Sequence, residues 1–182
     1  TFPNGISTAV VTFVSGGVVS TTDGGTVSGG TYAGSGTGKL TVTASACAAI
    51  IKAACTTMKT MTSGGDNYLA EEMGKGFKKM ADDGVVTTTV TGVLTPPSPA
   101  TPISPYGGAA KGTISCSETN LVTKLKALFQ KMYNQREQEG FDGNKEFAKV
   151  LANEINSFYT SGKISTDGQG NIAGSSGSGA IS

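Results

Sequence analysis

Histidine and tryptophan are absent from this chain of 182 residues, and charged residues are scarce. Without histidine there can be no serine–histidine–acid or cysteine–histidine nucleophile, no histidine general base and no metal site with imidazole ligands. Charged side chains make up 15% of the residues, below the usual share of about a quarter. The formal net charge of +1 lacks the basic surplus of a dedicated nucleic-acid binder. We therefore expect no enzyme, no cofactor, no metal and no nucleic-acid partner.

Long hydrophobic runs are also missing. No apolar stretch approaches the roughly 18 residues that a bilayer span needs, so we expect no membrane partner. The stretch 1–5 lacks the basic and apolar regions of a signal peptide, although a signal already removed from a mature chain would leave no trace.

Cysteine is limited to Cys47, Cys55 and Cys116, an odd number at long spacing. If Cys47 and Cys55 share a helix, they lie about 12 Å apart along its axis. A disulfide needs Cα atoms within about 7 Å, so these two cannot pair, whereas Cys116 could reach either one. We expect buried small hydrophobic residues in a protein made inside a cell.

Glycine is abundant instead, with 27 residues, and it gathers with threonine and serine toward the two ends of the chain. Up to residue 51 the only charges are Asp23 and Lys39. Apolar and hydroxyl residues alternate over 8–14 and 17–22 between glycine pairs, which predicts short strands or an extended arm over 1–39. The Gly/Ser tail, 168–182, is predicted to be flexible.

Apolar residues at three- and four-residue spacing predict four helices, over 45–63, 66–83, 118–135 and 145–159. Asp66 and Ser117 are the expected N-caps, and Gly84 is the expected residue after the second helix. The methionines fall on the faces predicted to be buried. Strand-like stretches are expected at 85–94, 111–115 and 163–166. Between the helix pairs, 95–110 holds five of the six prolines and predicts a semi-rigid spacer.

The two helix pairs match each other in sequence. With Ala70 set against Ala148, the apolar positions, the glycine stops Gly84 and Gly162, and the residues Thr88 and Thr166 agree without gaps. We therefore predict an α+β fold in which a strand–helix–helix–strand unit occurs twice, over 40–94 and 111–167. The two units would form a four-helix core with short strands at its ends. The Gly/Thr-rich arm 1–39 and the tail 168–182 would lie outside that core.

Each stretch that could form a chemical site is better explained by a structural role. The stretch 34–39 looks like a phosphate loop, but Ala33 and Leu40 stand where the motif needs glycine and a hydroxyl residue. Two calcium-like stretches, 142–146 and 167–171, have Asn153 and Ser178 at the position of the bidentate glutamate. The other candidates read as solvated helix faces with neighbouring opposite charges: the carboxylate pairs Glu71–Glu72 and Asp82–Asp83, and the basic residues Lys124, Lys126, Lys131 and Arg136.

Residues 147–166 form a predicted helix that breaks at Gly162 into a Thr/Ser strand, followed by the Gly/Ser tail. This order of helix, glycine break, Thr/Ser strand and Gly/Ser tail resembles small virion structural proteins of tailed bacteriophages. The resemblance implies a capsid, neck or tail subunit, located in the virion, whose partners are other virion proteins or further copies of itself. Low-charge arms that order only against neighbours lead to the same hypothesis, a non-enzymatic subunit that assembles through its arms. The alternative is an extracellular surface or ligand-binding module with a Thr/Ser-rich β face.

Overall fold

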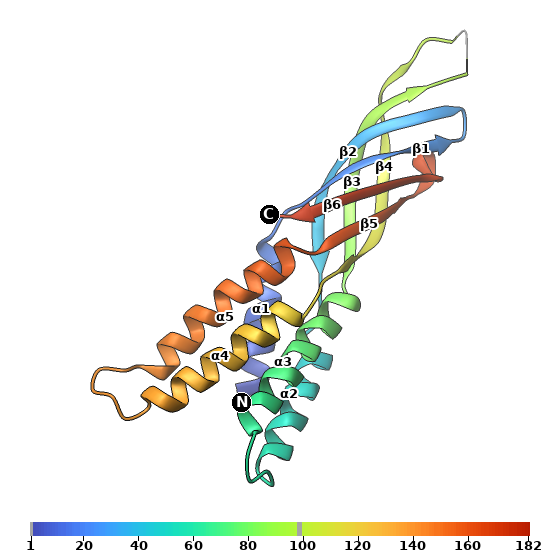
Figure 1. Ribbon diagram of the computed structural model, residues 1–182. Coiled ribbons are helices and arrows are strands. Elements are labelled where there is room, and N and C mark those ends of the chain that lie inside the picture. The colour runs from blue at the N-terminus through green and yellow to red at the C-terminus, as the bar shows by residue number, and fades with distance from the viewer. Residues whose placement is uncertain (1, 98–99) are drawn as a thin grey trace.

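The computed structural model describes residues 2–97 and 100–182, and its strands form one closed antiparallel barrel (Figure 1). The six strands pair in chain order, and β6 returns to pair with β1. Their bounds are β1 Val19–Val27, β2 Gly30–Thr41, β3 Val85–Thr95, β4 Ile103–Ser115, β5 Lys163–Gly168 and β6 Ser175–Ile181. A short 3₁₀ helix, η1 (Gly170–Ile172), connects the last two strands. Because the barrel is closed, every strand has a neighbour on both sides.

The helices gather at one end of the barrel (Figure 1). They are α1 Phe2–Gly16, α2 Ser45–Met58, α3 Gly65–Asp82, α4 Thr119–Gln135 and α5 Gly143–Thr160. In chain order each helix packs on the next, from α1 to α5. Helices α1, α3 and α5 run toward the barrel and lead into a strand, whereas α2 and α4 run away from it (Figure 1).

This order divides the described chain into three similar units around the barrel. Unit 1 is α1, β1, β2, α2, unit 2 is α3, β3, β4, α4, and unit 3 is α5, β5, β6. The β-hairpin registers align the units, because Val19 faces Gly38, Val86 faces Gly112, and Ile164 faces Gly179. Two residues further along each first strand the pairs are Thr21–Gly36, Thr88–Ala110 and Thr166–Gly177. The barrel is therefore a three-fold repeat of one hairpin.

The glycine between helix and strand follows the same repeat. A Cβ atom at Gly17 would meet Ile181 of β6 at 2.9 Å, and one at Gly84 would meet Leu40 of β2 at 2.9 Å. A Cβ atom at Gly162 would meet Ile114 of β4 at 2.7 Å. These three aliphatic side chains occupy equivalent ladder positions, so each unit closes its helix–strand corner with the same contact.

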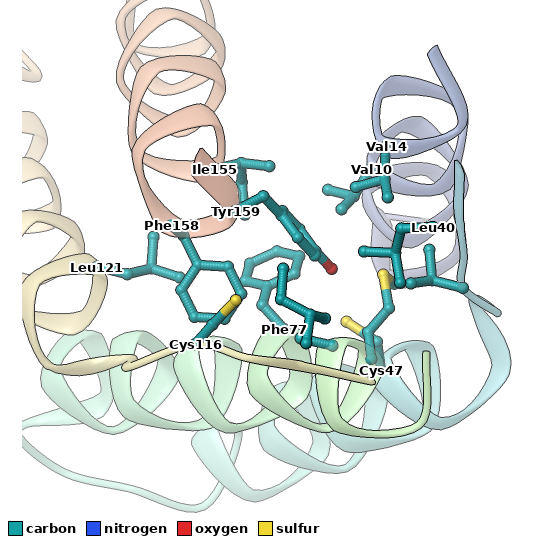
Figure 2. Packing of buried hydrophobic residues seen from close by; sticks show 14 of the residues in the cluster. Val10, Val14, Leu40, Cys47, Phe77, Cys116, Leu121, Ile155, Phe158 and Tyr159 are labelled. Atoms are coloured by element: carbon teal, nitrogen blue, oxygen red, sulfur yellow. The ribbon is translucent and has the colours of Figure 1, made fainter. Parts of the chain in front are cut away.

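Two apolar clusters make up the interior. The larger one joins the inner faces of all five described helices to the barrel residues nearest them, including Val19, Val86 and Ile164. Figure 2 shows part of it, with Tyr159 of α5 reaching toward Val10 and Val14 of α1. The smaller one fills the far end of the barrel with Val27, Tyr32, Val90, Leu94, Ala110 and Ile172.

The predicted fold class is wrong. The chain forms a closed six-stranded barrel with helices at one end, not a four-helix core with short strands and an extended N-terminal arm. The order strand–helix–helix–strand does occur twice, as β2-α2-α3-β3 and β4-α4-α5-β5. Its strands are long, however, and pair around the barrel, because their alternation places mostly hydroxyl side chains outside and mostly apolar or glycine residues inside.

The predicted segments contain the following elements. Residues 1–39 hold α1, β1 and most of β2, and the Pro-rich stretch 95–110 holds the end of β3 and the start of β4, with 98–99 outside the described residues. The tail 168–182 contains η1 and β6, and β6 pairs with both β1 and β5. Helix bounds for α3, α4 and α5 agree with the predictions to within two residues.

Candidate functional site

A polar layer lies inside the barrel between the two apolar clusters. It contains the three equivalent threonines Thr21, Thr88 and Thr166, together with Asp23 of β1, all buried. The Thr21 hydroxyl donates to Asp23 Oδ2 at 2.6 Å, and the Thr166 hydroxyl donates to Asp23 Oδ1 at 3.3 Å. The Asp23 carboxylate therefore bridges two of the three units.

The glycines opposite this layer make room for it. A Cβ atom at Gly177 would lie 2.1 Å from Asp23 Oδ1, and one at Gly36 would lie 2.5 Å from the Thr21 hydroxyl. The Thr88 and Tyr32 hydroxyls are buried and have no hydrogen-bond partner among the described residues. Burial, and then the charge of Asp23, raise the pKa of Tyr32. Asp23 is 3% exposed, so its carboxylate is enclosed and does not face a substrate from solvent.

An apolar groove lies between α1 and α5. It has a volume of about 310 Å³, and its lining is almost wholly apolar. Its walls are Gly5, Ile6, Ala9, Val10 and Phe13 of α1, and Phe147, Ala148, Leu151, Ala152 and Ile155 of α5. At the end far from the barrel, the Phe2 and Phe147 rings lie 5.8 Å apart. We call this feature the α1–α5 groove.

A second hollow of about 360 Å³ shares Phe13 with the α1–α5 groove and extends to the barrel, where Ile181 and Ser182 line it. Tyr159 lies at its inner wall, and its hydroxyl has no hydrogen-bond partner within the described ranges. Burial is the main cause that raises the pKa of Tyr159. The two hollows together follow α1 from Gly5 to Gly16.

The phosphate-loop and calcium candidates have structural roles. Residues 34–39 belong to strand β2, with Leu40 buried next to the exposed Lys39. Asp142 is the N-cap of α5, and its side chain accepts a hydrogen bond from the Lys145 backbone N–H at 3.0 Å. Asp167 belongs to β5. Within the part of the chain that the structure describes, no three cysteine or carboxylate side chains converge on a possible metal position.

The carboxylate pairs and three of the four basic residues, Lys126, Lys131 and Arg136, form ion pairs at the helix surfaces. Lys78 contacts Asp82 at 2.7 Å, and Lys79 contacts Asp83. Glu72 contacts Lys75 at 2.5 Å, while Glu71 reaches Lys126 of α4 at 2.5 Å. This hydrogen bond from Lys126 lowers the pKa of Glu71. The prediction of solvated helix faces is confirmed.

The three cysteines are free thiols. Cys47 and Cys116 are buried in the larger cluster, as predicted, whereas Cys55 is half-buried. Burial is the main cause that raises the pKa of Cys116 to about 11 and also raises that of Cys47.

Sequence reasoning missed the α1–α5 groove because it assigned 8–14 to a strand. The signal was present in the chain, since Pro3, Ser7, Val10 and Val14 are the buried residues of α1 and follow helical spacing. The helix that forms the α5 wall was predicted correctly, but the sequence did not show that a second helix, α1, lies opposite it.

Comparisons with protein-family models, with curated proteins and with solved structures give no match for this chain. Among residues 2–97 and 100–182, no helix is both long enough and apolar enough to span a membrane.

Proposed function

We propose that this chain is a non-enzymatic structural subunit of a larger protein assembly and that it contacts a neighbour through the α1–α5 groove. The groove itself carries the proposal. It combines a volume of about 310 Å³ with an almost wholly apolar lining, and Phe13, which is 49% exposed, stands at its edge. An apolar surface of this kind on a water-facing helix pair is typical of an interaction site.

The charges of the chain support a non-enzymatic role. The carboxylate pairs that could perform acid–base chemistry lie on α3 and at its C-cap, in ion pairs with lysines. The buried carboxylate, Asp23, is enclosed by the barrel strands. Neither arrangement places two titratable groups on opposite sides of a substrate.

The setting we propose is the virion of a tailed phage, with other virion proteins as neighbours. The support is the sequence style of residues 147–166, which resembles small virion subunits. The mode of contact differs from the sequence hypothesis, because the N-terminal segment is part of the barrel and the helices. We therefore assign the contact to the helical end of the molecule.

The test is incorporation of a groove variant into the assembly. Phe13→Asp places a charge in the groove without disturbing a buried side chain, so the isolated chain should melt at the wild-type temperature by circular dichroism. We expect its incorporation, measured by quantitative mass spectrometry of purified particles, to fall at least tenfold. Thr8→Asp, an exposed position of α1 outside the groove, is the matched control and should incorporate normally. Normal incorporation of Phe13→Asp would contradict the proposal.

One observation favours the alternative, a ligand-binding module. The outer face of β3 presents the exposed threonines Thr87, Thr89 and Thr91, and the last two line a shallow hollow with Tyr106. Neutral sugars would find hydroxyl groups and one aromatic ring there. An NMR titration with neutral monosaccharides tests this alternative, which predicts shifts confined to β3 and β4.

A further inference from the structure

The α5 wall of the α1–α5 groove is exposed where its counterpart is covered. Helices α3 and α5 have 18 residues each and align without gaps through the glycines that follow them. Ala70 and Gly74 of α3 are buried, and a Cβ atom at Gly74 would lie 2.3 Å from Val122 of α4. Their counterparts on α5, Ala148 and Ala152, are exposed in the groove. On α3, the following helix α4 packs against Gly74.

The α1 wall shows the same difference. By the hairpin register, Ala9 and Phe13 of α1 correspond to Gly76 and Met80 of α3. Gly76 is buried, with Cys47 of α2 3.2 Å from its Cβ position, and Met80 is 1% exposed. Ala9 is exposed, and Phe13 is 49% exposed. On α3, the preceding helix α2 lies against the first of these positions, Gly76.

Both walls of the α1–α5 groove therefore lack a helix of the described residues packed against them. Around the barrel, α2 lies between α1 and α3, and α4 lies between α3 and α5. The corresponding place between α5 and α1 holds no helix of the described residues, and the α1–α5 groove occupies it. The three-fold repeat therefore predicts that a helix fits this place. Its neighbours would be α1 and α5, and its direction would be that of α2 and α4.

One charged residue beside this place, Lys149, complements an acidic side chain. On α3, Glu71 faces α4 and pairs with Lys126, which lies one turn after Val122. The α5 counterpart of Glu71 is Lys149, an exposed residue with no salt bridge to any described residue. A helix in the sixth place would carry an apolar residue over Ala152 and an acidic residue one turn later.

We propose that the α1–α5 groove binds an amphipathic helix of a partner protein, which completes a ring of six helices. This inference rests on the proposed function and names the chemistry of the partner. The bound helix runs away from the barrel, antiparallel to α1 and α5, as α2 and α4 do. It presents apolar residues at positions i, i+4 and i+7, as in Leu121, Leu125 and Leu128 of α4, and an acidic residue facing Lys149.

The test uses peptides that copy residues 116–136, because α4 occupies the equivalent place in unit 2. One peptide has the natural lysine, and the other carries Lys126→Glu. Binding to the full chain is measured by fluorescence anisotropy. We expect the Lys126→Glu peptide to bind about fivefold more tightly than the natural one, as an exposed ion pair allows. With the Lys149→Glu chain, this preference should reverse, whereas the control Lys111→Glu, on the barrel, should leave it unchanged.

The position of binding has its own control. Ala152→Arg fills the groove, and Ala152 is already exposed, so the chain should fold normally and lose binding at least tenfold. Three results would overturn the proposal: neither peptide binds at millimolar concentration, the charge preference ignores Lys149→Glu, or Ala152→Arg binds as the wild type does.

The source of the helix is tested in the assembly itself. A photo-reactive amino acid at position 152 should crosslink to a helical segment of a different protein, with apolar residues at the stated spacing, when the product is sequenced by mass spectrometry. A crosslink to a lipid, to a second copy of this chain or to a further segment of the same polypeptide would overturn the partner assignment. If Phe13→Asp still blocks incorporation while these crosslinks are found, the proposed function holds and this inference fails.

Discussion

Inward-facing glycines set the width of the barrel at the level of single residues. A Cβ atom at Gly38, Gly112 or Gly179 would lie 1.9 Å from a carbonyl oxygen of the adjacent strand, closer than any real carbon can approach. These three positions are equivalent in the three hairpins. Glycine therefore allows the strands to approach each other at the same point of each unit, which explains part of the high glycine content.

Asp23 is a buried hydrogen-bond acceptor with no cation beside it among the described residues, and replacing it tests what its hydrogen bonds contribute to stability. Asp23→Ala leaves the Thr21 and Thr166 hydroxyls without their acceptor, and we expect it to destabilise the fold by about 1–3 kcal/mol. Asp23→Asn keeps an acceptor oxygen of the same shape and removes the charge, so its loss should stay below about 1 kcal/mol. Urea unfolding of the two variants measures the difference. Equal losses would show that the hydrogen bonds of this layer contribute nothing measurable to stability.

Cys116 links stability to alkaline pH. Burial raises the pKa of this thiol from 9.0 to about 11, so between these values the unfolded chain loses the proton while the folded chain keeps it. Rising pH then favours unfolding, and we expect a loss of about 2 kcal/mol from pH 9 to pH 11. Urea unfolding across this range measures it. Cys47 and Tyr159, whose pKa values are also raised, act in the same direction.

The control for this prediction is Cys116→Ala, which removes the titrating group. Its stability should be lower at neutral pH because of the lost sulfur, but its decline between pH 9 and pH 11 should be clearly shallower. A decline as steep as that of the wild type would show that Cys116 does not carry the effect.

At the scale of elements, strongly periodic helices could be predicted and α1 could not. Helices α3, α4 and α5 mix charged and apolar residues at clear helical spacing. Helix α1 contains no charge and is rich in β-branched residues, which favour strands by intrinsic propensity. Its burial on one face against α2 and the barrel overrides that propensity.

The C-terminal strand was missed for a related reason. Strand β6 has small residues, and a Gly/Ser stretch is flexible in isolation. Its stability comes from neighbours on both sides, β1 and β5. Ladder pairing with strands that are distant in sequence is invisible to local pattern reasoning.

The close packing of neighbouring helices depends on small residues, and Gly74, where α3 packs on α4, tests this dependence. A Cβ atom at this position would lie 2.3 Å from Val122 Cγ2 of α4, so Gly74→Ala should destabilise the fold by about 1–3 kcal/mol despite the better helix propensity of alanine. Val122→Ala removes the obstructing methyl groups. The double variant should therefore recover at least half of the loss, as measured by a thermal-unfolding double-mutant cycle. Strict additivity would contradict this packing.

At the scale of the whole molecule, the repeat was detected in part and counted wrongly. The predicted match of residues 70–88 with 148–166 agrees with the alignment of units 2 and 3. Unit 1 was not recognised because α1 was taken for a strand, so two units were predicted where the barrel has three. The α1–α5 groove follows only from the third unit, and no single motif in the sequence encodes it.

Completion of the ring within one chain gives the last prediction. Three residues separate β2 from α2 and β4 from α4, and Ser182 corresponds to Thr41 and Ser115 in the hairpin register. A copy of residues 116–135 joined directly after Ser182, with Lys126→Glu in the copy, should therefore reach the α1–α5 groove with a linker of natural length.

We expect this six-helix chain to melt several degrees higher than the parent, because the added helix buries Phe13 and the two groove walls against apolar side chains. Amide hydrogen exchange in α1 and α5 should slow at the same time. The matched control carries Leu121→Asp and Leu125→Asp in the copy, which removes the apolar face but keeps the length, and it should melt as the parent does. If the leucine version gives no gain over that control, the three-fold repeat does not extend to the helices, and the groove is not shaped for a sixth one.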